Sequence, residues 1–290
     1  MGPFINHFVS GRAFFSGVAL ILGGMLASML SKNRLACVMA LIIGICGLIT
    51  VALSATPFPV WLYICCAVVL LTYTVVHSVR SVRYRRMYDT LTVVFICTTV
   101  FWQLSYYQMP ELPERYDNKF YLVGDSISAG IGNNEIVRWP QIIRERHSVD
   151  SVDFSSPGAT VQSSLNRAAK IPVDDHLVLL EIGGNDVLGK TPLAEFESSL
   201  SALLRTLCYG RRVIVMLEIP LPPFCNGYGL IQRRLARQFG VVLIPRRFFA
   251  DVLATNQATV DGLHLSQQGH EAMASMVWEF LRPALEGLRL

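Results

Sequence analysis

The sequence predicts a two-part fold: a bundle of four transmembrane helices, followed by a three-layer α/β/α domain with a parallel five-stranded sheet. Four apolar segments without a charged residue follow one another in the first 109 residues, and beyond them five short apolar runs alternate with helical patterns. The charge balance changes at the same point, with seven basic residues and one acidic residue up to Met109 but 18 basic and 20 acidic residues after it. The sequence therefore divides into a membrane domain at residues 1–109, a linker at 110–118 and a second domain at 119–290.

The four apolar segments are each about 18 to 21 residues long, the length of helix that crosses a hydrocarbon core of about 30 Å. They comprise residues 13–30, 35–54, 58–78 and 90–107. Four such runs in succession are not typical of the buried helices of a soluble protein. The last segment, which contains Gln103 and several threonines, is the least apolar. Gly23 and Ala27, four residues apart, are small enough to let two of these helices pack closely.

The basic residues between the segments predict which side of the membrane each domain faces. Lys32 and Arg34 lie between the first two segments, and arginines at positions 80, 83, 85 and 86 lie between the last two. Short loops rich in Lys and Arg stay in the cytoplasm, so the N-terminus and the second domain are expected outside the inner (cytoplasmic) membrane, facing the periplasm or exterior. Removal of the first segment as a signal peptide would send the four arginines outside, and we reject that alternative.

Residues 119–290 alternate between strand and helix patterns. Strands are expected near Phe120, Val152, Leu177, Val213 and Val241. Helices are expected at residues 140–147, 161–170, 192–208, 229–239 and 266–285. Strands that alternate with helices are joined by right-handed crossovers, which gives a parallel sheet covered on both faces. We expect a flavodoxin-like strand order.

Short polar motifs follow these strands. Gly-Asp-Ser at 124–126 ends the first strand, so Ser126 is expected at the carboxyl edge of the sheet, where open α/β folds bind their ligands. Further along the chain come SSPGAT at 155–160, EIGGND at 181–186 and DGLHLS at 261–266. Because Asp and Ser are ordinary turn residues, Gly-Asp-Ser alone is a weak signal, and its weight comes from the other three motifs.

In this order the motifs resemble those of the GDSL-type or SGNH hydrolases, a family named for a catalytic Ser, Gly, Asn and His. Matched motif by motif, the resemblance implies that Ser126 is the nucleophile, that Asp261 and His264 are the acid and base, and that Gly158 and Asn185 complete the oxyanion hole. It covers residues 119–285, implies the SGNH-hydrolase fold, and is especially similar to the bacterial periplasmic thioesterase and lysophospholipase (arylesterase-like) branch.

The residue types suit this chemistry. A serine hydroxyl becomes a good nucleophile when an imidazole takes its proton and a carboxylate orients the imidazole, and a three-residue offset brings Asp261 to the Nδ1 side of His264. The oxyanion formed by attack on an acyl group needs preorganised donors, for which we expect the backbone N–H groups of Ser126 and Gly158 and the amide of Asn185. Asp125 and Asp186 are expected to hold local turns, and Glu181 to be a satisfied buried carboxylate.

We therefore expect a membrane-anchored serine esterase or lipase-type hydrolase that cleaves acyl esters or thioesters, such as lysophospholipids or fatty acyl substrates, through an acyl-enzyme. Apolar residues in the loops after the strands suit an acyl chain: Leu188, Leu221, Phe224 and Tyr228. The alternative is that they pack on the membrane or on the domain itself. The alternatives are an O-acetylesterase or O-acetyltransferase of an envelope polysaccharide, and a non-catalytic assembly or binding module.

The expected partners are the lipid bilayer and an ester or thioester substrate that is lipid-like. No phosphate-binding glycine loop and no metal-ligand spacing occur in the sequence, so no cofactor or metal is expected. No basic stripe with interleaved aromatic residues occurs in the second domain, which argues against nucleic acid as a partner.

Overall fold

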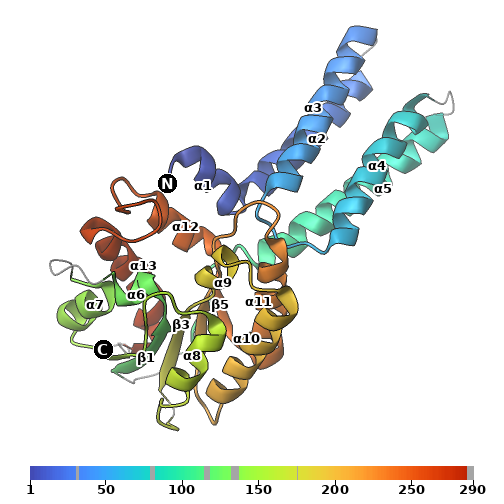
Figure 1. Cartoon of the computed structure of the whole chain (residues 1–290). Helices are drawn as coiled ribbons and strands as arrows, with labels where there is room; N and C mark the ends of the chain where they lie inside the picture. Colours follow the sequence, from blue (N-terminus) through green and yellow to red (C-terminus); the bar gives the residue numbers. More distant parts are fainter. Residues whose placement is uncertain (31–32, 79–81, 114–117, 132–136, 175, 286–290) are drawn as a thin grey trace. The chain divides into compact units, whose positions relative to one another are not determined.

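The computed structural model describes the 290-residue chain apart from residues 31–32, 79–81, 114–117, 132–136, 175 and 286–290 (Figure 1). Its contacts divide the chain into two compact units. The helical unit comprises His7–Gln108 and Pro222–Asn226, and the α/β unit comprises Met1–Asn6, Met109–Leu221 and Gly227–Leu290. Two basic residues used above to predict orientation, Lys32 and Arg80, and residues 114–117 of the predicted linker lie outside the described residues.

Four long helices form most of the helical unit, after a short helix that was not predicted. They are α2 (Arg12–Leu30), α3 (Arg34–Leu53), α4 (Val60–Ser78) and α5 (Val82–Ser105), and the short one is α1 (Pro3–Val9). α3 begins at a capping residue, because the side chain of Asn33 accepts the N–H of Leu35 at 3.0 Å. Arg83, Arg85 and Arg86, which were expected in a loop, lie in the first turns of α5.

The four expected membrane-spanning helices are borne out in part. Three helices of the described chain are long and apolar enough to cross a membrane: Arg12–Leu30, Arg34–Leu53 and Arg86–Ser105. The third predicted segment forms α4 (Val60–Ser78), in which Val60–Val69 is an apolar stretch of the described chain.

Glycines bring the backbones of α2 and α3 into contact. A Cβ atom added to Gly17 would lie 2.7 Å from the carbonyl oxygen of Gly47, and one added to Gly24 would lie 2.7 Å from that of Ala40. A Cβ on Gly23 would meet nothing within 4 Å, so the predicted role of Gly23 in close packing was wrong. The contact residues recur at a seven-residue spacing, from Gly17 to Gly24, which keeps them on one helix face.

A parallel five-stranded sheet forms the centre of the α/β unit, as predicted. Its strands are β1 (Lys119–Gly124), β2 (Asp150–Asp153), β3 (Leu177–Glu181), β4 (Ile214–Leu217) and β5 (Val242–Ile244). Their order is β2-β1-β3-β4-β5, and every neighbouring pair is parallel. β1 and β3 end side by side, because Gly124 pairs with Glu181, so the polar residues that follow both strands meet at one edge.

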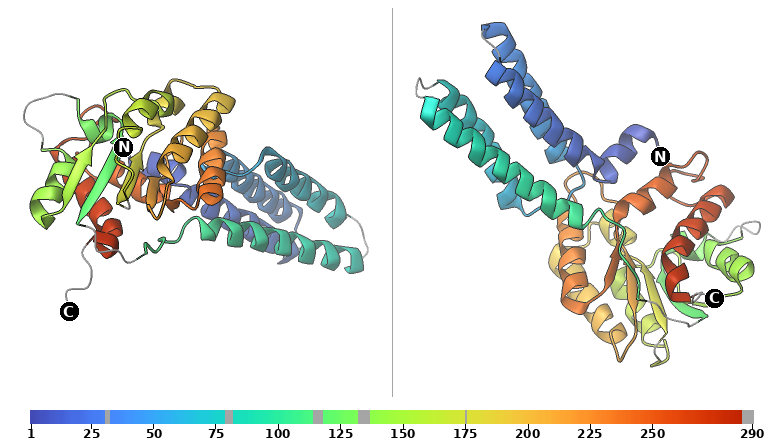
Figure 2. Two further views of the ribbon diagram at one scale, coloured as in Figure 1. Left: turned by 90° about the horizontal axis from the view of Figure 1, so that it is seen from below. Right: turned by 180° about the vertical axis from the view of Figure 1, so that it is seen from behind.

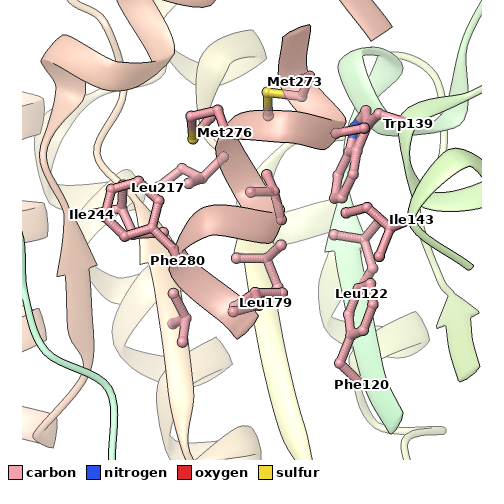
Figure 3. Packing of buried hydrophobic residues seen from close by; sticks show 14 of the residues in the cluster. Phe120, Leu122, Trp139, Ile143, Leu179, Leu217, Ile244, Met273, Met276 and Phe280 are labelled. Atoms are coloured by element: carbon pink, nitrogen blue, oxygen red, sulfur yellow. The ribbon is translucent and has the colours of Figure 1, made fainter. Parts of the chain in front are cut away.

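Helices cover both faces of this sheet (Figures 1 and 2). On one face lie α7 (Trp139–His147), α12 (Arg246–Ala254) and α13 (Gln267–Leu285), and on the other lie α8 (Val161–Ala168), α10 (Leu193–Leu207) and α11 (Asn226–Phe239). Figure 3 shows Leu122, Leu179 and Leu217 of the strands packed with Met273 and Phe280 of α13. The alternation of side chains along each strand leaves the intervening residues, such as Val123 and Leu180, for the second layer of core.

Five of these helices were predicted to within a few residues, whereas α12 and two short helices were not. The short helices are α6 (Ser126–Ala129) and α9 (Gly184–Leu188), which follow β1 and β3. Four or five residues are too few to show a helical period in the sequence.

The first six residues of the chain belong to the α/β unit. The terminal ammonium of Met1 donates to the carbonyl oxygen of Leu253 at 3.1 Å, and Asn6 Nδ2 donates to Asp251 Oδ1 at 2.9 Å. The N-terminus is therefore held against α12, although the sequence separation is about 250 residues.

Candidate active site

Ser126 is the first residue of α6, directly after β1. Asp125 caps this helix, because its Oδ1 accepts the N–H of Ile127 at 2.9 Å. The Ser126 side chain is mostly buried, with 9 % of the residue exposed. Among the described residues nothing accepts the N–H of Ser126, so this donor is available to a ligand at the end of the sheet.

Asp261 and His264 form the pair that their spacing predicted. His264 Nδ1 lies 2.6 Å from Asp261 Oδ2, while Asp261 Oδ1 accepts the N–H groups of Leu263 and His264 at 2.9 and 2.8 Å. These bonds, with the one to the His264 ring as the largest contribution, hold the pKa of Asp261 well below its usual range. An ionised Asp261 fixes the His264 proton on Nδ1 and leaves Nε2 as a hydrogen-bond acceptor.

Asn185 brings three of the motifs together. Its amide Nδ2 donates to the carbonyl oxygen of Ala159 at 3.0 Å and to Asp125 Oδ2 at 3.3 Å. Ala159 follows Gly158, and Asp125 precedes Ser126, so the ends of β1, β2 and β3 meet at this side chain. Three of the five predicted site residues are therefore brought together: Asn185 itself, Ser126 next to Asp125, and Gly158 next to Ala159.

Gly158 lies in the turn after β2. Its φ of +71° is in the left-handed region, which favours glycine. The turn is closed by a bond from the Ala159 N–H to the Ser156 carbonyl oxygen at 3.1 Å. In the part of the chain that the structure describes, nothing accepts the N–H of Gly158, as an oxyanion donor requires.

The charge of His264 affects Asp125, the residue before Ser126. Burial raises the pKa of the Asp125 carboxyl group, against the effects of the bond from Ile127 and of the nearby charge of His264. Within the described residues there is no hydrogen bond between the Ser126 hydroxyl group and the His264 ring, a bond that often tightens only with substrate.

Gly183 allows the sharp turn between β3 and Asn185. Its φ is +109°, and a Cβ added there would lie 2.6 Å from Ile219 Cδ1. A larger residue would be both strained and in collision with the core.

Asp186 holds its own loop, as expected, and also joins that loop to a second segment. Its carboxyl group is hydrogen-bonded to the side chain of Thr191, and its Oδ2 accepts the N–H of Val161 at 2.9 Å, at the beginning of α8. Burial raises the pKa of Asp186 against the effect of these bonds. The sequence could not indicate the partner in α8, because Val161 and Asp186 are 25 positions apart.

Glu181 is buried and satisfied, as predicted. Its Oε2 accepts the hydroxyl of Ser128 at 2.7 Å and the N–H of Asp125 at 3.3 Å. The sequence analysis did not identify Ser128 as the partner of Glu181. The signal that could have indicated it was its position two residues after Ser126, together with Glu181 at the end of a neighbouring strand.

The loop residues expected to contact an acyl chain divide into two groups. Leu188 and Phe224 are exposed, at 57 % and 80 %. Leu221 and Tyr228 are buried, and Tyr228 packs edge-on against Phe196 of α10, so these two pack on the domain itself, which was the alternative to contact with an acyl chain. Two further residues near the motifs, Ile131 and Leu263, are exposed. No group of three His, Cys, Asp or Glu in the described chain could hold a metal ion.

Known proteins are similar to a little over half of this chain. The GDSL-like Lipase/Acylhydrolase family matches residues 122–272. The esterase TesA of Pseudomonas aeruginosa is 25% identical over 178 residues, which cover 57% of this chain and 88% of that protein. The thioesterase 1/protease 1/lysophospholipase L1 of Escherichia coli is 26% identical over 174 residues, covering 56% of this chain and 82% of that protein.

This fold is also found in solved structures. The psychrotrophic esterase EstA from a Pseudoalteromonas species superimposes with a TM-score of 0.51 and 19% sequence identity. The match covers 57% of this chain and 97% of that one.

Proposed function

The chain belongs to the GDSL-like lipase/acylhydrolase family, and on this premise we propose that it is a membrane-anchored serine hydrolase that cleaves lipid-like acyl esters or thioesters. Hydrolysis of the esterase or thioesterase type follows from the family and from its relatives. The observation that carries the proposal for the site is the position of Asn185, whose amide bonds to groups beside Ser126 and Gly158.

In the proposed reaction, Ser126 Oγ attacks the acyl carbonyl carbon while His264 Nε2 takes its proton. Asp261 holds the Nδ1 proton of His264 and stabilises the imidazolium that forms. The N–H groups of Ser126 and Gly158 and the amide of Asn185 stabilise the oxyanion. The leaving alcohol or thiol receives the proton from His264, and a water activated by the same histidine then hydrolyses the acyl-enzyme.

Exposed apolar side chains near the motifs support a lipid-like acyl group as substrate. Leu188 follows Asn185 by three residues on α9, and Leu263 precedes the proposed base. Both are exposed, at 57 % and 38 %, which allows a hydrocarbon chain to cover them. The name of the Escherichia coli relative includes thioesterase and lysophospholipase activities, which agrees with this class of substrate.

Membrane anchoring is proposed from the three long apolar helices and from the position of the N-terminus. Met1 and Asn6 bond to Leu253 and Asp251 in the α/β unit, so the N-terminus and this unit lie on the same side of the membrane. An even number of crossings satisfies this condition. With α2 and α3 as one crossing pair, α4 and α5 either both cross or both remain on one side.

The test is turnover by the purified full-length protein on p-nitrophenyl esters from acetyl to palmitoyl, together with lysophospholipid and an acetylated polysaccharide. We expect a preference for medium or long acyl chains. Ser126→Ala should lower kcat by about 10⁴-fold to 10⁶-fold and abolish labelling by a fluorophosphonate probe. Labelling that survives this substitution would remove Ser126 from the mechanism, and an optimum at acetyl would refute the lipid-like substrate.

A further inference from the structure

Two buried carboxyl groups beneath the candidate site have no part in the reaction proposed above. Asp125 and Glu181 are each 3 % exposed. Asp125 directly follows β1, and Glu181 is the last residue of the adjacent strand β3, where it pairs with Gly124. Buried acids are rarely kept unless they are bonded or used, so their contacts require an explanation.

The two carboxyl groups belong to one buried cluster of polar groups. Glu181 Oε2 accepts the Ser128 hydroxyl at 2.7 Å and the backbone N–H of Asp125 at 3.3 Å. Asp125 accepts N–H groups at both oxygens, from Ile127 at Oδ1 and from Asn185 at Oδ2. Two negative charges buried this close together repel each other, so a single proton on one of the two carboxyl groups is favoured over two carboxylates.

Glu181 is the better position for this proton. Burial raises the pKa of Glu181 well above its usual value, and the repulsion from Asp125 adds to this effect. Burial raises the pKa of Asp125 too, but the Ile127 N–H and the charge of His264 oppose the shift. The other charged groups that face the pair are Asp186, near Asp125, and Asp153, near Glu181, and both disfavour a second negative charge.

We propose that Asp125 and Glu181 share one proton and are positioning residues, in which protonated Glu181 keeps Asp125 as an ionised acceptor that orients the amide of Asn185. The inference rests on the proposed place of Asn185 in the oxyanion hole. The Asp125 carboxylate and the Ala159 carbonyl group are both acceptors, so only the NH₂ group of the amide can face them. Rotation of the amide by 180° would set its oxygen against both acceptors.

This arrangement explains how Asn185 remains ready for the oxyanion. The bond to Ala159, at 3.0 Å, has an ordinary length, whereas the bond to Asp125 is long, at 3.3 Å. The N–H directed at Asp125 is therefore the one expected to turn to the oxyanion as the charge develops. The carboxylate sets the orientation of the amide without competing strongly for its hydrogen.

Two substitutions of Glu181 test the shared proton. Gln has the shape of a protonated Glu, with an N–H donor for Asp125 and a carbonyl acceptor for Ser128, whereas Leu has a similar volume and neither. We expect Glu181→Gln to keep at least about one third of kcat, and Glu181→Leu to lower kcat by about 10²-fold with little change in KM. Asp125→Asn, which can turn a donor toward Asn185, should lower kcat by a similar factor.

The proton itself is measured by infrared spectroscopy of the full-length protein in detergent. A protonated carboxylic acid has a carbonyl stretch that ionised carboxylates lack, and we expect this band at pH 8 in the wild type and in Ser126→Ala but not in Glu181→Gln. A wild type without the band, or a Glu181→Gln enzyme as slow as the Glu181→Leu enzyme, would overturn the inference. The band does not depend on turnover, so failure of the proposed function, in which Ser126→Ala remains active, is separate from failure of the shared proton.

Discussion

Asn185 is the residue at which the proposed mechanism can be tested most directly. Its amide contributes a hydrogen bond that strengthens when the acyl oxygen becomes negative, so its effect belongs to the transition state and not to substrate binding. We expect Asn185→Ala to lower kcat by about 10² to 10³, or roughly 3 to 4 kcal/mol, with little change in KM. Steady-state kinetics on the best ester of the panel gives both constants.

A matched control for this variant is Asn118→Ala. Asn118 Nδ2 donates to the carbonyl oxygen of Ser148 beside the beginning of β1, at the opposite edge of the sheet from the candidate site. The same truncation there removes one hydrogen bond, and kcat should stay close to that of the wild type. If Asn185→Ala raises KM and leaves kcat unchanged, Asn185 binds the substrate and is not an oxyanion donor.

At the scale of single residues, the sequence predicted positions that follow strands better than it predicted contacts between them. Asp261 and His264 were predicted as a pair because three residues separate them, and one turn brings them together. The bond from Val161 to Asp186 and the contact between Asp125 and Glu181 depend on which strands are neighbours and on their register. A linear pattern does not contain that register.

Among the elements, one buried ion cluster connects β4, α11 and α12. Glu218, one residue after β4, accepts Arg233 Nε at 2.6 Å and the N–H of Arg246 at 3.1 Å. All three residues are almost fully buried. Burial alone would raise the pKa of Glu218, but the charges of Arg233 and then Arg246 outweigh it and lower the pKa to about 2.

This cluster makes stability depend on acidity. Because the folded pKa of Glu218 is below its ordinary 4.5, its contribution is complete above pH 4.5 and is lost as the pH falls toward 2. Glu218→Gln leaves two arginines without their carboxylate and should lower stability at pH 7 by about 3 to 5 kcal/mol. Thermal melting of the detergent-solubilised protein between pH 7 and pH 3 measures both effects.

Glu197→Gln is the control on the surface. Glu197 Oε2 pairs with Arg234 at 2.7 Å, and both side chains are about half exposed. Loss of an exposed pair should change stability by less than about 1 kcal/mol. Equal melting temperatures for Glu218→Gln and the wild type at pH 7 would contradict the structural role of the cluster.

The pair of helices α2 and α3 gives a second prediction at this scale. Their backbones touch at Gly17 and Gly47, where an added Cβ would lie 2.6 to 2.7 Å from the opposite carbonyl oxygen. Gly17→Leu must separate the helices and should lower the melting temperature of the solubilised protein. Gly23→Leu, on an exposed face with open space around it, should not, and an equal loss in both would exclude close packing as the cause.

Elements with a clear pattern were predictable, and elements defined by their surroundings were not. Four of the five strands lie in apolar runs between turn residues, and the longer helices show one buried face, so these elements appear in the sequence. β2, with the sequence DSVD, has only one apolar residue. α6 begins where Asp125 caps it after β1, and α9 begins at the turn that Gly183 allows after β3. Both helices therefore depend on the ends of two paired strands.

For the whole molecule, the contacts of the N-terminus restrict the possible topologies. Met1 and Asn6 bond to residues of the α/β unit, so in the proposed membrane-anchored arrangement both ends of the apolar region lie on the same side of the membrane. Arg34 is the first residue of α3, and Arg83 and Arg86 are exposed near the beginning of α5. These basic residues therefore lie beside the connection between α2 and α3 and the connection between α4 and α5. The positive-inside rule then keeps these ends in the cytoplasm.

The resulting prediction is that the α/β unit faces the periplasm or exterior, where alkaline phosphatase folds and green fluorescent protein does not. Phosphatase fused after Leu290 should be active, and the fluorescent protein at the same position should be dark. A fluorescent fusion between α4 and α5 should be bright if these helices cross, because the arginines near the beginning of α5 hold that loop in the cytoplasm. A bright fusion after Leu290 with inactive phosphatase would refute this orientation, and the search for substrates would then move to cytoplasmic thioesters.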